Sequence, residues 1–168
     1  MLTLVLGGAR SGKSRYAEWL IATYPPPWIY LATAEAGDDE MAERIAAHRA
    51  RRDAAWQTVE APHDLAGALE ATPAGTAVLV DCLTLWLSNA MQLELDIETE
   101  TARLLDALAA RTGPTVAVSN EVGLGIVPDN VLARRFRDLQ GTLNQKLAAQ
   151  AQRVIMMVAG VPVAVKSP

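Results

Sequence analysis

An apolar run at residues 2–6 leads directly into the glycine-rich segment Gly7-Gly8-Ala9-Arg10-Ser11-Gly12-Lys13-Ser14. This segment matches the P-loop pattern G-x-x-x-x-G-K-[ST] and follows the strand-like run that the motif requires. Its three glycines permit backbone angles that let successive N–H groups converge on a phosphate. The helix expected to begin there directs its positive end at the same anion. The sequence therefore predicts a strand, a nucleotide-binding loop and a helix, in that order.

The residue types of this loop assign individual roles. Residues Gly7 to Ser14 are expected to bind the nucleotide, with Lys13 reaching the β- and γ-phosphates as a catalytic residue and Ser14 holding Mg²⁺. Asp81 ends the apolar run 77–80 and is expected to hold the metal opposite Ser14, directly or through water. Its alternative role is to cap the helix that follows. Glu60 also follows a short apolar stretch, where nucleotide binding and a solvated loop position are both open.

Apolar β-rich runs alternate with helical patterns along the whole chain. The strands are expected at Thr3–Leu6, Trp28–Thr33, Trp56–Val59, Thr76–Val80, Thr115–Ser119, Arg153–Val158 and Pro162–Lys166. The helices are expected at Lys13–Thr23, Asp39–Arg52, Asp64–Glu70, Leu83–Met91, Ile97–Arg111 and Asn130–Gln150. In the last helix an apolar face is formed by Leu132, Phe136, Leu139, Leu143 and Leu147. This alternation predicts one α/β domain over residues 1–168, with a mainly parallel sheet and helices on both faces.

The composition is that of an ordinary globular protein, with 51% hydrophobic and 20% charged residues. A net charge of −4 argues against a nucleic-acid groove. The single cysteine, Cys82, excludes an internal disulfide. The longest apolar stretch, residues 154–165, contains Gly160 and Pro162 and is too short to span a bilayer. No signal peptide is evident, so we expect a cytoplasmic protein without a membrane span.

His48 lies in a predicted helix that is acidic at its start and basic toward its end. This distribution stabilises any helix through its dipole, in which case His48 is an ordinary surface histidine. The alternative depends on spacing, because Arg44, Arg51 and Arg52 lie four residues before and three and four residues after His48. Such arginines would bind a polyphosphate and keep the imidazole neutral and nucleophilic, able to attack phosphorus.

A segment with two glycines and a proline, Asn120 to Pro128, separates the fifth expected strand from the last helix. In a parallel sheet, ligands bind beyond the carboxyl ends of the strands. We therefore expect this segment to form a loop across the mouth of the site, although turn chemistry alone explains its glycines and proline.

Together these motifs resemble the bifunctional adenosylcobinamide kinase/adenosylcobinamide-phosphate guanylyltransferases of cobalamin biosynthesis. The resemblance covers essentially the whole chain, and the His48 helix and the Asn120–Pro128 loop make it specific. Other segments that contribute are Tyr30 to Ala34, Asp39 to Met41, Asp81 to Thr84 and Arg134 to Asp138.

The resemblance implies two reactions at one nucleotide site. In the first, ATP or GTP phosphorylates the aminopropanol hydroxyl of adenosylcobinamide. In the second, GTP guanylylates His48 with release of pyrophosphate, and adenosylcobinamide phosphate then accepts GMP from that histidine. By analogy the nucleotide site also includes Ala32, Thr33, Ala34, Arg49, Ala50, Arg51, Arg52, Glu60 and Asp81. The family further implies a P-loop sheet related to the RecA type and a homo-oligomer, a trimer.

Other functions remain open at this stage. A small-molecule P-loop kinase without guanylyltransfer would have no use for His48. A regulatory GTP switch is disfavoured because no N-K-x-D stretch occurs, and a DNA-dependent motor is disfavoured by the acidic balance. The corrinoid contacts are also open: Trp86, Trp56 and Tyr30 could flank a macrocycle or lie in the core.

Overall fold

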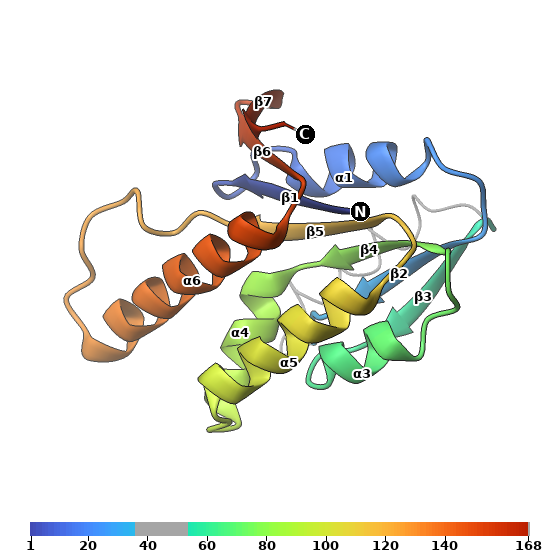
Figure 1. Ribbon diagram of the computed structural model, residues 1–168. Coiled ribbons are helices and arrows are strands. Elements are labelled where there is room, and N and C mark those ends of the chain that lie inside the picture. Colours follow the sequence, from blue (N-terminus) through green and yellow to red (C-terminus); the bar gives the residue numbers. More distant parts are fainter. Residues whose placement is uncertain (36–53, 168) are drawn as a thin grey trace.

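The computed structural model describes residues 1–35 and 54–167 and contains a seven-stranded sheet in the order β3-β2-β4-β5-β1-β6-β7 (Figure 1). All neighbouring strands are parallel except β6 and β7, which form an antiparallel hairpin. The strands are β1 (Leu2–Gly7), β2 (Trp28–Ala32), β3 (Trp56–Glu60), β4 (Ala77–Asp81), β5 (Thr115–Asn120), β6 (Arg153–Val158) and β7 (Val161–Lys166). The predicted, mainly parallel α/β sheet is confirmed.

Helices lie on both faces of this sheet (Figure 1). They are α1 (Lys13–Ile21), α3 (Leu65–Glu70), α4 (Leu83–Gln92), α5 (Ile97–Ala110) and α6 (Val131–Gln150). Side chains of α1 pack with one set of alternate strand residues, including Val5, Leu79 and Val118. The other four helices pack with the opposite set, which includes Leu4 and Val80. This division follows from the alternation of side chains along a strand.

Each element predicted within the described residues is present, with ends shifted by no more than two positions. The predicted helix Asp39–Arg52 lies outside the described residues. Within the described ranges, no helix is long and apolar enough to cross a membrane.

The predicted helix α6 is present, and only part of its apolar face is buried. Leu143 and Leu147 are in the core and Phe136 is partly buried against it, whereas Leu132 is 66% exposed. The amino end of α6 projects away from the sheet (Figure 1). Helical spacing places these residues on one face, but only the carboxyl-terminal half of that face has a sheet and neighbouring helices to pack against.

Arg111 ties together three elements at the amino-terminal edge of the sheet. Its guanidinium donates to the carbonyl oxygens of Leu69 (3.2 Å) and Thr76 (2.7 Å) and to the hydroxyl of Thr115 (3.0 Å). Partial burial lowers the pKa of Arg111 from its ordinary value. The three bonds connect the end of α3 with the starts of β4 and β5, opposite the edge where parallel sheets bind ligands.

We expect Arg111→Ala to lower the free energy of unfolding by about 3 kcal/mol, because it removes charge-assisted hydrogen bonds and leaves half-buried carbonyl groups unpaired. Urea denaturation measures this loss. The matched control is Arg103→Ala, since Arg103 forms exposed ion pairs with Asp64 and Glu100 and should contribute much less. Equal losses for the two variants would contradict the assignment.

Candidate nucleotide-binding site

The P-loop connects β1 to α1 at the carboxyl edge of the sheet. Gly7 lies where an added Cβ would come within 2.8 Å of the Met157 carbonyl oxygen. Gly12 precedes α1 in a left-handed conformation, with φ of 92°. Gly8, the second glycine of the loop, has no atom within 4 Å of an added Cβ and no positive φ. The predicted need for glycine therefore holds at Gly7 and Gly12, while space and φ leave Gly8 unconstrained.

Lys13, the first residue of α1, is buried in this loop. Its ammonium group donates to the Gly8 carbonyl oxygen at 2.6 Å and lies 3.5 Å from the Ser11 hydroxyl. Burial lowers the pKa of Lys13 from 10.5, and negative charge on Cys82 or Asp81 opposes this shift. An anionic phosphate beside this ammonium would compensate its desolvation better than a neutral carbonyl does.

Asp81 ends β4 at the same edge, and its Oδ2 accepts a hydrogen bond from the Tyr30 hydroxyl at 3.0 Å. The N-cap of α4 is Cys82, without a side-chain capping bond, so the alternative role of Asp81 as a helix cap is wrong. Asp81 follows Ala77 and Leu79 on the face of the sheet that α1 covers. Its carboxylate is thus free of capping and faces the layer that contains Lys13.

Three of the predicted nucleotide-site residues lie in one row across the edge. Ala32 of β2 is in register with Glu60 of β3 on one side and with Asp81 of β4 on the other. Glu60 is exposed at the end of β3 rather than in a loop. The parallel register therefore brings Ala32 together with residues that are 28 and 49 positions further along the chain.

Thr33 is fully buried, and its polar groups are all used internally. Its hydroxyl donates to the Cys82 carbonyl oxygen (2.7 Å) and accepts from the Cys82 N–H (2.8 Å). Its own N–H donates to the Asp81 carbonyl oxygen, and its carbonyl oxygen accepts from the Asn89 amide. The side chain of Thr33 thus fixes the backbone beside Asp81, and the expected nucleotide contact of this residue stays a prediction, as does that of Ala34.

Asn89 of α4 is a positioning residue that the sequence analysis did not identify. Its side-chain amide donates to the carbonyl oxygens of Thr33 (2.9 Å) and Pro62 (3.1 Å). The two acceptors lie just beyond β2 and β3, so one buried amide holds both strand exits. Asn89 lies among the buried residues of α4, next to Ala90, so an amide within an apolar face was the available sequence signal.

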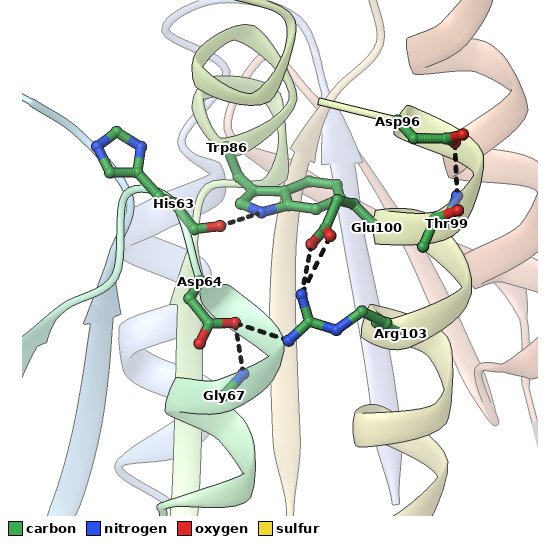
Figure 2. A network of polar contacts seen from close by, with 8 residues as sticks. All are labelled: His63, Asp64, Gly67, Trp86, Asp96, Thr99, Glu100 and Arg103. Carbon is green, nitrogen blue, oxygen red and sulfur yellow. Dashed lines mark hydrogen bonds and ion pairs between the residues drawn. The ribbon is translucent and has the colours of Figure 1, made fainter. Parts of the chain in front are cut away.

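A polar network supports the chain just beyond β3 (Figure 2). The Trp86 indole donates to the His63 carbonyl oxygen at 3.2 Å, and Trp86 is 1% exposed. Asp64 caps α3 by accepting from the Gly67 N–H and also pairs with Arg103, which in turn contacts Glu100. Trp86 is therefore a core residue, which removes it from the candidates for corrinoid contact.

The predicted site residues not yet placed are the segment around His48 and Ser14. His48 and the run Arg49, Ala50, Arg51, Arg52 lie outside the described residues. Ser14, the second residue of α1, is partly exposed at the mouth of the P-loop. Together with Asp81 it offers one hydroxyl and one carboxylate, a donor set that suits Mg²⁺, which takes its remaining ligands from phosphates and water.

A phosphate-binding loop beyond a central parallel strand, with a lysine inside it and an aspartate at a nearby strand end, defines a P-loop nucleotide-binding protein. Solved structures share this fold. A protein of Pyrococcus horikoshii OT3 is 11% identical with a TM-score of 0.56, covering 99% of this chain and 86% of its own. The RadB recombinase is 16% identical with a TM-score of 0.53, covering 92% and 73%. At these identities the similarity concerns the fold alone.

Sequence comparison identifies the family within this class. The model of the cobinamide kinase / cobinamide phosphate guanyltransferase family matches residues 3–165. The bifunctional adenosylcobalamin biosynthesis protein CobP of Pseudomonas aeruginosa is 50% identical, covering 99% of this chain and 98% of its own. The corresponding CobU protein of Salmonella typhimurium is 41% identical, covering 99% and 100%. The chain belongs to the cobinamide kinase / cobinamide phosphate guanyltransferase family, and is thus a bifunctional transferase of adenosylcobalamin biosynthesis.

Cys82 offers a direct test of the electrostatics at this edge. Burial and the adjacent Asp81 carboxylate raise the pKa of Cys82 from 9.0 to about 11. Because only the thiolate reacts, we expect iodoacetamide to modify native Cys82 on the order of 10-fold more slowly than unfolded protein at pH 8. The native rate should keep rising with pH up to about 11, where thiolate formation is half complete.

Urea-unfolded protein is the control, and its alkylation rate should level off above the ordinary cysteine pKa. The absence of any other cysteine makes the measured label specific for this position. A native rate that also levels off near pH 9 would contradict the electrostatic assignment.

Proposed function

We propose that both reactions of the family use the P-loop site, with Gly7 to Ser14 holding the triphosphate. The observation that carries this proposal is the position of Lys13, buried in the loop at the carboxyl edge of the sheet with Asp81 close enough to affect its charge. Lys13 would neutralise charge on the β- and γ-phosphates while the aminopropanol hydroxyl of adenosylcobinamide attacks the γ-phosphorus. The donor is ATP or GTP.

Ser14 and Asp81 are the residues that would hold Mg²⁺. A magnesium ion held there would supply positive charge to neutralise the β- and γ-phosphates. The Tyr30 hydroxyl, which donates to Asp81 Oδ2, would orient the carboxylate from the side of the core. Tyr30 therefore has a supporting role beneath the site rather than a contact with the corrinoid.

For the second reaction we assign His48 as the nucleophile that attacks the α-phosphorus of GTP. A GMP–histidine forms as pyrophosphate leaves, and the phosphate of adenosylcobinamide phosphate then displaces the histidine. The arginines Arg49, Arg51 and Arg52 would bind the phosphates, with Ala50, Ala32, Thr33, Ala34 and Glu60 completing the nucleotide site. Support comes from the chain order, since the His48 segment follows Ala34 and Glu35 directly beyond the carboxyl end of β2.

We also assign the chain as a single catalytic domain that forms a homotrimer in the cytoplasm, where its nucleotide substrates occur. The trimer is supported by an exposed apolar segment between β5 and the start of α6. Its residues, with exposures from 63% to 99%, are Leu124, Ile126, Val127, Val131 and Leu132. Five exposed apolar side chains on one projecting segment are typical of an interface between protein subunits.

The two chemical steps are separable by substitution at His48. With GTP labelled at the α-phosphate, we expect denatured wild type to retain acid-labile label and His48→Ala to retain none, because only the imidazole forms a phosphoramidate. His48→Ala should still phosphorylate adenosylcobinamide, whereas Lys13→Ala should lose about 100-fold or more in that reaction.

The control for the labelling experiment is His63→Ala, since His63 is the only other histidine. Its side chain lies 3.3 Å from Glu35, and the variant should retain the label. Label on His48→Ala would contradict the assignment of His48 and place the nucleophile at another residue. No label on wild type that phosphorylates its substrate would support the alternative of a P-loop kinase without guanylyltransfer.

For the oligomer, light scattering should give wild type a mass three times the 18.0 kDa of one chain. Ile126 is 99% exposed in the chain alone, so Ile126→Asp would bury a charge in the interface and should reduce the mass to that of a monomer. The matched control is Leu93→Asp, at an apolar residue that is 51% exposed away from this segment. A trimer that survives Ile126→Asp would exclude the segment from the interface.

A further inference from the structure

Asn120, which has no role in the site described so far, lies between the P-loop and Asp81. It is the last residue of β5, the strand between β1 and β4. Asn120 is in register with Gly7, and the N–H of the next residue, Glu121, donates to the Gly7 carbonyl oxygen at 3.1 Å. On the other side, Asp81 is in register with Val118, two residues before Asn120.

Strand alternation determines the face on which Asn120 lies. Val116 and Val118 pack in the cluster of α1, whereas Ser119 contacts α6 on the opposite face. Asn120 therefore follows Val118 on the α1 face, which is also the face of Asp81 and of the P-loop helix. Asn120 is in register with Gly7, the first residue of the P-loop. The γ-phosphate of a bound triphosphate would lie near this position.

The backbone of Asn120 is fixed from two helices. Its N–H donates to the Thr84 hydroxyl of α4 at 2.8 Å, and its carbonyl oxygen accepts from the Asn144 amide of α6 at 3.1 Å. No hydrogen bond to the side-chain amide of Asn120 occurs within residues 1–35 and 54–167. Two buried side chains, Thr84 and Asn144, thus fix the backbone of Asn120. The side-chain NH₂ of Asn120 is available, among the described residues, to donate to a ligand.

Asn144 is itself held by a buried amide–hydroxyl cluster, which we call the α6 clamp: Ser119, Gln140 and Asn144. Ser119 Oγ donates to Asn144 Oδ1 at 2.6 Å, and Gln140 Nε2 donates to Ser119 Oγ at 2.9 Å and to Asn144 Oδ1 at 3.1 Å. All three are at most 5% exposed, and Gln140 Oε1 has no hydrogen-bond partner among the described residues. Burying these groups costs free energy that an apolar interface would avoid, which favours a positioning role.

We infer that Asn120 is a further catalytic residue of the phosphoryl transfer proposed above, its side-chain amide donating to an oxygen of the γ-phosphoryl group as this group moves. The new bond joins the substrate hydroxyl oxygen to the γ-phosphorus, and the bond from that phosphorus to the β-phosphate oxygen breaks. The nucleoside diphosphate leaves, and the hydroxyl proton passes to solvent. Asn120 gains and loses no proton. The α6 clamp and Thr84 are positioning residues that act through it.

The first test is the kinetics of adenosylcobinamide phosphorylation by Asn120→Ala and Asn120→Asp, measured beside wild type. We expect kcat to fall about 100-fold in both, as for other preorganised donors to a transition state, with KM for ATP changed less than about 3-fold. Asn120→Asp keeps the shape but replaces the NH₂ donor with an acceptor oxygen. The matched control is Gln145→Ala, which removes an exposed amide of α6 and should match wild type.

These variants separate the inference from the proposed function. Wild type that does not phosphorylate adenosylcobinamide would contradict the proposed function. An active wild type with unchanged kcat in Asn120→Ala, or with full activity retained in Asn120→Asp, would overturn the role of the amide. The hydrogen bonds that hold residue 120 use its backbone, so the alanine variant should unfold at the temperature of wild type.

A double-mutant cycle tests the α6 clamp. If Asn144 acts through Asn120, Asn144→Ala should lower kcat in the wild-type background and have little further effect in Asn120→Ala. A merely structural role predicts additive losses that follow the loss in melting temperature, and that result would overturn the positioning role of the α6 clamp. The Asn120 variants test the catalytic amide even if Asn144→Ala does not fold.

Discussion

The pairing of β1 with strands on both sides determines where a phosphate can be bound. Gly7 is in register with Asn120 of β5 and with Met157 of β6, so the P-loop leaves the sheet from a fixed point. The close approach of the Met157 carbonyl oxygen leaves no room for a side chain at Gly7. A loop anchored in this way presents its N–H groups without the entropic cost of ordering them when the anion binds.

Around this point, amide and hydroxyl side chains hold the strand exits by contacting backbone groups. Thr33 fixes Cys82, Asn89 fixes Thr33 and Pro62, and Thr84 and Asn144 fix Asn120. Neutral groups suit this purpose, because a site for triphosphates already has to balance the charges of Lys13 and Asp81. Additional buried charges would shift those pKa values and require partners of their own.

The sequence analysis was most successful where a residue's role depends on its own chain neighbours. The strands follow from apolar runs, and the need for glycine at residue 12 follows from its left-handed backbone angle. It did not determine which part of an apolar face is covered by other elements: helical spacing predicted the apolar face of α6, and the structure leaves Leu132 on that face 66% exposed. The roles of Asn89, Asn120, Gln140 and Asn144 were missed because each depends on hydrogen-bond partners or register neighbours from other elements.

The sequence by itself determined the order of strands and helices along the chain, the P-loop and the family. Each of these is recognised from short contiguous segments, whose residue spacing reflects local geometry. Only the tertiary structure decided that Glu60, Ala32 and Asp81 form one row and that Asn120 lies level with Gly7. It also decided that Asp81 caps no helix and that Trp86 is a core residue. These facts depend on strand order and parallel register, which join residues far apart in the chain and leave no local pattern.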